Sequence, residues 1–223
     1  MHRRLLSILI LLFAGVSAHG ATAWKAGEHY FVLQPAQPTT LDNNKVEVTE
    51  VFSYGCPACN AFYPFAEKLK ASLPPNAQLV FLPASFIPAE DWPMFQRAYC
   101  TAQALGVADK THKAMFDAVW KTGELATIDP STQRIKKKLP TIEDAAKFYN
   151  RVAGVSVEKF LATAKSFSVD VATKRADQLI KAYRADSTPT IVVNGKYRLT
   201  VQSAGGTDQL IELVKWLVAK ESK

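Results

Sequence analysis

Cysteine is scarce in this sequence, with three among 223 residues. Small secreted domains that depend on disulfides for stability have a much higher cysteine density, so that class is excluded. Glycine (10) and proline (12) are too few for a collagen-like or low-complexity chain. Charged residues make up 21% and hydrophobic residues 48%, which excludes a disordered chain and leaves one large globular domain or two small ones.

Membrane-spanning hydrophobic runs are also lacking: the apolar stretch from Leu5 to Val16 is too short to cross a bilayer. It follows His2-Arg3-Arg4 and precedes small residues, the order typical of a secretory signal peptide. We therefore predict that residues 1–23 are an export signal, cleaved after Ala18 or after Ala23. An N-terminal anchor helix is the alternative. Export predicts an oxidising compartment, in which thiols are chemically active.

A concentrated basic surface is not evident. The 27 basic and 20 acidic residues give a net charge of +7, but two of the arginines lie within residues 1–23, which leaves +5 on the remaining chain. That charge is spread along the sequence and no aromatic-rich basic motif accompanies it. We expect no nucleic-acid partner.

What the sequence does contain is an alternation of strand and helix patterns. Residues 45–54 alternate and are β-branched, residues from Pro57 to the Pro74-Pro75 pair repeat at helical spacing, and residues 78–82 form a second strand pattern. Strand patterns return at 190–193 and 196–200, joined by Asn194-Gly195, a strong signal for a type I′ hairpin. Amphipathic helices are expected before this hairpin, at 168–185, and after it.

The stretch between these two groups lacks strand patterns. Helices are expected at 91–105 and 108–121, at Thr141 with a capping-box variant, and after Ser156. The sequence therefore predicts an α/β domain formed by residues 24–83 and 168–223, interrupted by an all-helical insertion at residues 84–167.

The chemistry-bearing motif is Cys56-Pro57-Ala58-Cys59, where the first strand pattern gives way to a helix. Cys56 falls at the N-cap, where unpaired N–H groups and the helix dipole stabilise a thiolate, whereas Cys59 lies one turn further in and is better buried. Such an unequal pair suits thiol–disulfide exchange through a mixed disulfide at Cys56. Two other interpretations of this motif are one half of a zinc site and a disulfide that takes no part in redox chemistry. The first lacks further ligands in paired spacing, and the second closes too small a loop to stabilise much.

The segment from Phe52 to Cys59, Pro64 in the following helix, the helical insertion, and Ser187-Thr188-Pro189-Thr190 before a strand together resemble the DsbA family of periplasmic thiol:disulfide oxidoreductases. The resemblance implies a thioredoxin-like α/β fold with an inserted all-helical domain. It further implies that Cys56 is the nucleophile, Cys59 the resolving cysteine, Thr188 and Pro189 a substrate-binding loop with a cis peptide bond, and Pro57 and Ala58 part of the active-site loop.

Glu50 corresponds by the resemblance to a buried acid beside the active site. It shares one face of its strand with Val48 and Phe52, so we expect burial, a raised pKa and a role in relaying the proton of Cys59. A glutamate that reaches solvent is the alternative. Ala58 stands where the strongest oxidants of the family have His, so we expect a weaker oxidant. Tyr63 stands where many relatives have a second acid.

The implied activity is a dithiol oxidase that donates its Cys56–Cys59 disulfide to newly exported proteins. Its expected partners are unfolded or partly folded proteins with free cysteines and a quinone-linked inner-membrane oxidase of the DsbB type. We expect a monomer that needs no cofactor and no metal. Cys100 is expected to be a buried, inert thiol, with a redox role as the alternative. Alternatives for the whole chain are a disulfide isomerase or reductase of the same fold, and a peptide-binding chaperone that needs no redox chemistry.

Overall fold

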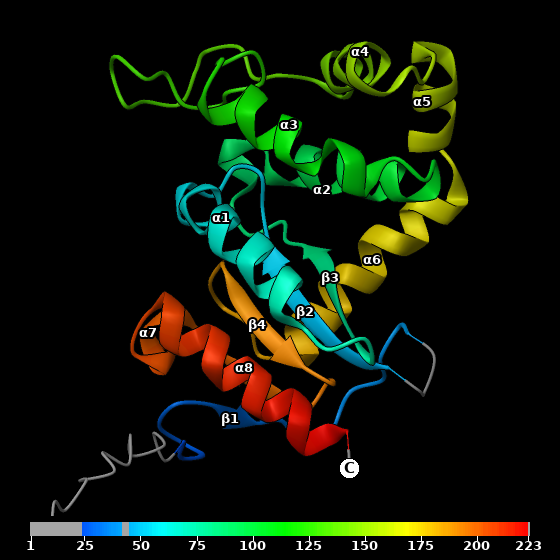
Figure 1. The fold of residues 1–223 in the computed structure, drawn as a ribbon. Coiled ribbons are helices and arrows are strands. Elements are labelled where there is room, and N and C mark those ends of the chain that lie inside the picture. The colour runs from blue at the N-terminus through cyan, green and yellow to red at the C-terminus, as the bar shows by residue number, and fades with distance from the viewer. Residues whose placement is uncertain (1–23, 42–44, 223) are drawn as a thin grey trace, which may run out of the picture.

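The computed structural model describes residues 24–41 and 45–222 (Figure 1). The predicted export signal, residues 1–23, lies outside the described residues. No helix within the described part is both long enough and apolar enough to cross a membrane.

A five-stranded sheet forms the centre of the molecule, in the order β1-β5-β4-β2-β3. The strands are β1 (Phe31–Val32), β2 (Val46–Phe52), β3 (Ala77–Pro83), β4 (Thr190–Val193) and β5 (Tyr197–Leu199). β2 pairs in parallel with β3, and its other neighbour, β4, runs antiparallel to it. β2 is thus an inner strand whose carboxyl end points toward the beginning of helix α1 (Pro57–Ser72).

The predicted hairpin between β4 and β5 is confirmed. Asn194 and Gly195 have φ angles of 51° and 63°, the left-handed values that both central residues of a type I′ turn need. Gly195 also has no room for a side chain, because a Cβ atom there would lie 2.1 Å from the carbonyl oxygen of Gln37. The turn sets the register in which Val193 faces Tyr197 and Ile191 faces Leu199.

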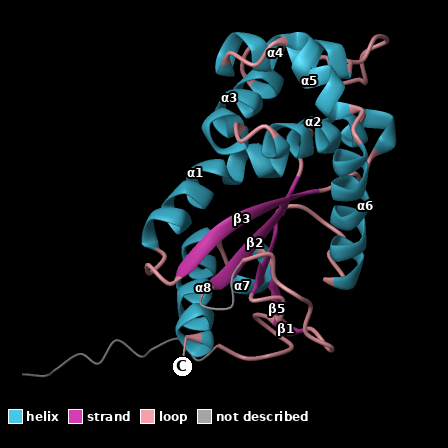
Figure 2. Cartoon of the chain, turned by 90° about the vertical axis from the view of Figure 1, so that its right-hand side faces the viewer, coloured by secondary structure: helices cyan, strands magenta, loops and turns pink. Residues whose placement is uncertain are grey.

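Helices cover both faces of the sheet (Figure 2). α1 (Pro57–Ser72) and α8 (Thr207–Glu221) lie on one side, and α6 (Phe167–Ala182) lies on the other. A one-turn helix, α7 (Val201–Ala204), which the sequence patterns did not predict, connects β5 to α8. Because helices cover both sides, every residue of β2 is buried.

The chain between β3 and α6 is helical, as predicted. It contains the 3-10 turn η1 (Pro88–Glu90) and helices α2 (Trp92–Ala104), α3 (Ala108–Trp120), α4 (Ile142–Ala153) and α5 (Val157–Ala164). Its only strand-like pairing among the described residues is the single bridge between Ile128 and Ile135. The capping box of Thr141 and Asp144 and the cap from Ser156 are both present. The exact division at residues 83/84 and 167/168 stays a prediction.

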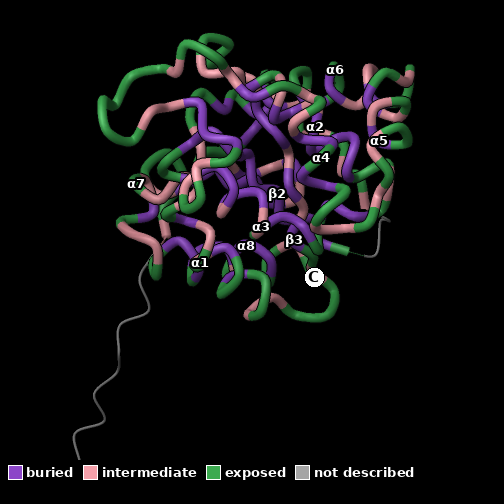
Figure 3. The backbone as a smooth tube through the Cα atoms, turned by 90° about the horizontal axis from the view of Figure 1, so that it is seen from above, coloured by how far each residue is buried: buried purple, intermediate pink, exposed green. Residues whose placement is uncertain are grey.

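The helical segment and the sheet share one hydrophobic core, which lies below the exposed loops (Figure 3). His112 of α3 is at the meeting point: it is buried, and its ring lies 4.9 Å from that of Phe52 and 4.2 Å from that of Phe81. Its Nδ1 is 2.8 Å from the Tyr54 hydroxyl. Burial lowers the pKa of His112 to about 3, so it is a neutral packing residue near neutral pH.

Candidate active site

Cys56 occupies the N-cap of α1, and Pro57 the first helical position, as the sequence predicted. Proline is suited to that position because its missing N–H would have no partner within the helix. The backbone N–H of Cys59 donates to Cys56 Sγ at 3.3 Å, so the first turn of the helix directs a donor at this sulfur. The same N-cap geometry leaves Cys56 5% exposed and places Cys59, one turn further in, fully inside the core.

Both active-site cysteines are free thiols, and the structure gives them opposite acidities. The pKa of Cys56 is lowered to about 6, chiefly by the hydrogen bond from the Cys59 thiol, while the N–H groups of Ala58 and Cys59 add to the effect against the cost of burial. Burial raises the pKa of Cys59 well above its usual value, and the charge of the Cys56 thiolate raises it further. One sulfur is therefore a thiolate near neutral pH and the other a thiol.

Thr188 and Pro189 lie against the first cysteine although they are more than 130 positions away in the sequence. The peptide bond between them is cis. Cys56 Sγ lies 3.4 Å from the Thr188 carbonyl oxygen, to which it donates when it is protonated. Thr188, Pro189 and Ala58 also line one open groove of about 670 Å³. The residues named from the sequence as a substrate-binding loop thus come together with the active-site loop.

Glu50 of β2 is buried, with 2% of its surface exposed. Its Oε2 has no hydrogen-bond partner among the described residues. Burial raises the pKa of Glu50 to about 8, with a smaller contribution from the Cys56 thiolate. The Glu50 charge in turn raises the pKa of Cys59. This places a neutral carboxylic acid within electrostatic reach of both sulfurs.

A second buried glutamate on the same strand, Glu47, did not stand out in the sequence. It faces the opposite side of β2, where its Oε2 accepts from the backbone N–H groups of Thr40 and Leu41 and from the Thr40 hydroxyl. Its Oε1 accepts from the Thr49 hydroxyl at 2.9 Å. Glu47 is therefore a satisfied structural carboxylate, and the unpartnered Glu50 is the one available for proton transfer.

Two tryptophans of the helical segment hold the turn that precedes Cys56, and sequence reasoning missed both. Trp120 Nε1 donates to the Tyr54 carbonyl at 2.7 Å. The Trp92 ring lies so close to Gly55 that a Cβ atom at this position would be 2.6 Å from Trp92 Nε1. The only sequence signal was a glycine directly before the first cysteine, which is consistent with a close approach.

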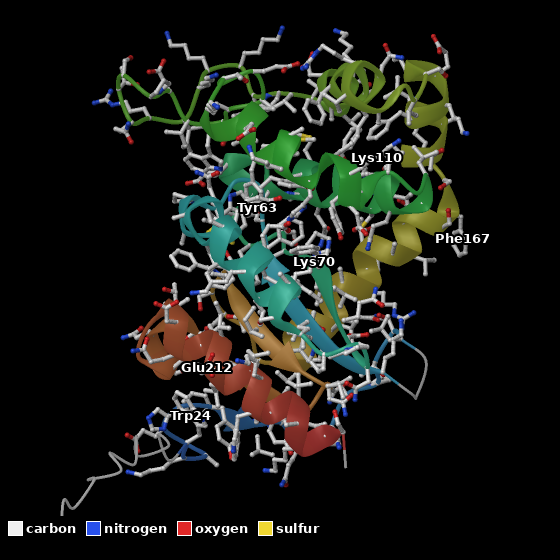
Figure 4. The ribbon with its side chains drawn as sticks, in the orientation of Figure 1. Trp24, Tyr63, Lys70, Lys110, Phe167 and Glu212 are labelled. Atoms are coloured by element: carbon white, nitrogen blue, oxygen red, sulfur yellow. The ribbon has the colours of Figure 1, made fainter. Side chains whose placement is uncertain are left out.

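Cys100 is buried in the structure, and Tyr63 packs against the helical segment. Cys100 is 3% exposed, and burial raises its pKa to about 12, in agreement with the expected inert thiol. Tyr63 lies on the side of α1 that faces α3 (Figure 4), with its ring 5.9 Å from His112 and 5.8 Å from Phe116. At the position where the resemblance leads one to expect a second acid, this chain thus has an aromatic contact with the helical segment.

Comparisons with known proteins agree with this arrangement. The thioredoxin family model matches residues 42–213. The thiol:disulfide interchange protein DsbA of Pseudomonas aeruginosa strain PAO1 is 35% identical over 96% of this chain and 95% of its own length, and that of Burkholderia cepacia is 31% identical over 98% and 99%.

Solved structures show the same relationship. The crystal structure of Pseudomonas aeruginosa DsbA superposes with a TM-score of 0.74 at 36% identity, covering 89% of this chain and 94% of that one. The oxidoreductase DsbA from Xylella fastidiosa gives 0.74 at 30% identity, covering 86% and 94%. The fold is therefore thioredoxin-like with a helical insertion, and the chain belongs to the DsbA family of thiol:disulfide interchange proteins and is a disulfide oxidoreductase.

Proposed function

We propose that this protein oxidises the thiols of exported proteins in the periplasm by donating a Cys56–Cys59 disulfide. A substrate thiolate attacks Cys56 Sγ, the Cys56–Cys59 bond breaks, and Cys59 leaves with the bonding electron pair. A second substrate thiolate then attacks the substrate sulfur of the mixed disulfide and releases the Cys56 thiolate. The substrate gains a disulfide, and the enzyme is left as a dithiol.

The observation that supports this most strongly is the unequal acidity of the two sulfurs. Cys56 is the leaving group of the second step, and a thiol with its pKa lowered to about 6 leaves readily. Cys59 is fully buried, so a substrate sulfur reaches only Cys56. The same asymmetry stabilises the reduced enzyme, because the Cys56 thiolate is held by the donors of α1, and this favours transfer of the disulfide to the substrate.

We assign Glu50 the role of moving the proton of Cys59. Near neutral pH its carboxyl is mostly protonated, since its pKa is raised to about 8. It therefore supplies a proton as Cys59 leaves, and its carboxylate accepts one when Cys59 must attack during reoxidation. An acid with an ordinary pKa would be ionised before the first step and could not donate.

The groove beside Cys56 is the proposed binding site of the substrate polypeptide. Thr188, Pro189 and Ala58 line it, and the Thr188 carbonyl oxygen lies 3.4 Å from Cys56 Sγ. A groove of about 670 Å³ that is open to solvent suits an extended segment around a cysteine, as in an unfolded or partly folded protein. Family membership implies substrate proteins as partners. A DsbB-type inner-membrane oxidase as the reoxidant, and a monomeric enzyme, complete the proposal.

Ala58 bears on the strength of the oxidant. A histidine at this position would add a donor beside the Cys56 thiolate, whereas an alanine side chain cannot donate. We therefore propose a less oxidising potential than in relatives that carry His there. Equilibration of the Cys56–Cys59 pair with glutathione measures it, and Ala58→His is expected to shift the potential in the oxidising direction.

The double variant Cys56→Ser, Cys59→Ser tests the function. A reduced peptide with two cysteines is mixed with the oxidised wild-type protein or with the variant, and disulfide formation is followed by mass spectrometry. We expect stoichiometric oxidation by the wild type and none by the variant, with Cys100→Ser as the control that also removes a thiol. Oxidation by the double variant would overturn the assignment, and so would a wild-type protein that leaves the peptide reduced.

A further inference from the structure

The groove beside Pro189 does not end where the active-site loop ends. Its lining extends from Ala58 past the Thr188–Pro189 loop to Phe31 of β1 and Arg198 of β5. Phe31 and Arg198 also line a second hollow of about 440 Å³, which adjoins the first. An extended chain bound beside Cys56 would therefore pass Arg198 as it leaves the groove.

The Arg198 guanidinium at this junction has few partners for its charge. It lies over the Phe31 ring, 5.0 Å from the ring centre to Cζ, and Nη1 donates to the Arg184 carbonyl at 2.6 Å. Nε is buried and has no partner among the described residues, none of which forms an ion pair with this arginine. A cation held in place this way, with no carboxylate partner among the described residues, is suited to binding a carboxylate of a ligand.

All the charged residues that line the second hollow are positive. Its charged lining residues are Arg184 and Arg198, and the remaining lining residues are apolar or glycine. Arg184 is exposed and takes no part in an ion pair within the described chain. The one carboxylate of the first groove, Asp186, lies next to Ser187 in the loop before Pro189 and does not line the second hollow.

We propose that Arg184 and Arg198 form a subsite for an acidic side chain of the substrate, so that the enzyme favours cysteines with Asp or Glu a few residues away in the direction that leaves the groove past Arg198. This rests on the proposed function, because it assumes that an extended polypeptide occupies the groove. Arg198 is a specificity-determining residue in this proposal, since it contacts the bound chain and not the reacting sulfurs. Phe31 would make an apolar contact with the methylene stem of the substrate's acidic side chain.

The test uses a set of reduced dithiol peptides that differ only at one position, occupied by Glu, Gln or Lys, with this position moved stepwise along both sides of the attacking cysteine. We measure the second-order rate constant of single-turnover oxidation by the disulfide form of the wild type, Arg198→Gln, Arg198→Glu and Arg184→Glu. At one position on one side, the wild type is expected to prefer Glu over Gln by about five- to tenfold, and less at high salt. Arg198→Gln should bring the ratio close to one, and Arg198→Glu should reverse it in favour of Lys.

Lys110→Glu is the matched control. Lys110 is an exposed residue of α3 in the helical segment (Figure 4), and α3 lies far from β1 and β5 (Figure 2). Its reversal therefore changes the net charge equally without changing the groove. It should keep the wild-type ratio of Glu to Gln peptides. An equal shift in this control would overturn the subsite, since the preference would then come from overall charge.

The wild-type measurement tests the proposal even if an Arg198 variant fails to fold. Equal rates for all peptides at every position overturn the acidic subsite and leave the oxidase intact. A wild-type protein that oxidises none of the peptides overturns the proposed function itself. A preference for Glu that persists in Arg198→Glu and Arg184→Glu, with circular dichroism showing folded variants, also overturns the assignment to these two residues.

Discussion

Replacing Cys59 by alanine tests which groups keep Cys56 ionised. The hydrogen bond from the Cys59 thiol is the largest cause of the lowered Cys56 pKa, about 6 in the intact pair. The variant removes this donor but keeps the backbone N–H of residue 59, whose nitrogen lies 3.3 Å from Cys56 Sγ. A hydrogen bond to a charged group contributes about 1.5–3 kcal/mol, which corresponds to about 1–2 pKa units. We expect Cys59→Ala to raise the pKa of Cys56 to about 7–8.

Cys59→Ser is the matched variant, because a serine hydroxyl is again a donor at the same place. Its effect on the Cys56 pKa should be smaller than that of alanine. The assay is the ultraviolet absorbance of the thiolate in the reduced protein as a function of pH. Cys100 contributes no titration near neutrality, because burial raises its pKa to about 12.

Two outcomes would refute the reasoning. If Cys59→Ala left the pKa of Cys56 near 6, the backbone donors and the helix dipole alone would account for the acidity. If the pKa rose to about 8.5, the ordinary value, the backbone donors would only offset the cost of burial and would not keep Cys56 acidic. The expected range predicts a thiolate fraction near pH 7 that falls from about 90% in the wild type to about 10–50% in the alanine variant.

Three further predictions concern residues around this pair. Glu50 stays protonated in the folded protein up to its pKa of about 8 but ionises near 4.3 when unfolded, so stability falls as pH rises between these values. In urea unfolding, Glu50→Gln should be more stable than the wild type near pH 8, by at most about 5 kcal/mol, with no such gain near pH 4. Gly55→Ala should destabilise the fold by about 1–3 kcal/mol and change tryptophan fluorescence, because its Cβ would lie 2.6 Å from Trp92 Nε1. Iodoacetamide at neutral pH should label Cys56 of the reduced protein and spare Cys100 until urea unfolds it; equal labelling in a peptide map would contradict the burial of Cys100.

Local chemistry explains why much of the fold could be predicted. Asn194 and Gly195 adopt the positive φ angles that their small or locally hydrogen-bonding side chains tolerate, so the hairpin followed from two residues. Thr141 and Asp144 satisfy each other's backbone N–H groups without help from any distant residue. The N-cap position of Cys56 was also predictable from a neighbouring residue, because proline favours the first helical position, which here is residue 57.

The alternation of residues along β2 was less reliable for predicting which of its two glutamates belongs to the active site. Glu50 was expected to be buried because it shares a face with valines and an aromatic residue, and it is buried. Glu47 on the other face is buried as well, because helices cover both sides of the strand. Periodicity therefore did not separate the two carboxylates. What separates them is hydrogen bonding: Glu47 accepts four hydrogen bonds, and Oε2 of Glu50 accepts none from the described residues.

The sequence did not reveal that the helical segment contacts the active site. The contacts are made by individual side chains that lie far from the active-site motif in the sequence. Trp120 and His112 reach the two sides of Tyr54, one its carbonyl and the other its hydroxyl, from a helix more than 50 residues further along the chain. Neither residue has a pattern that distinguishes it from an ordinary core residue of an amphipathic helix.

These contacts matter for the chemistry because the acidity of Cys56 depends on where the N–H groups of α1 point. Those N–H groups are aimed by the turn between β2 and Pro57, which is held from within by the bond from the Cys56 N–H to the Ser53 carbonyl at 3.1 Å. It is held from outside by Trp120, through the Tyr54 carbonyl. The motif Cys-Pro-Ala-Cys supplies the sulfurs and the first helical turn, but the segment inserted between β3 and α6 fixes the orientation of that turn. The redox properties of the pair are therefore set jointly by two parts of the chain, and substitutions at Trp120 should affect them without touching either sulfur.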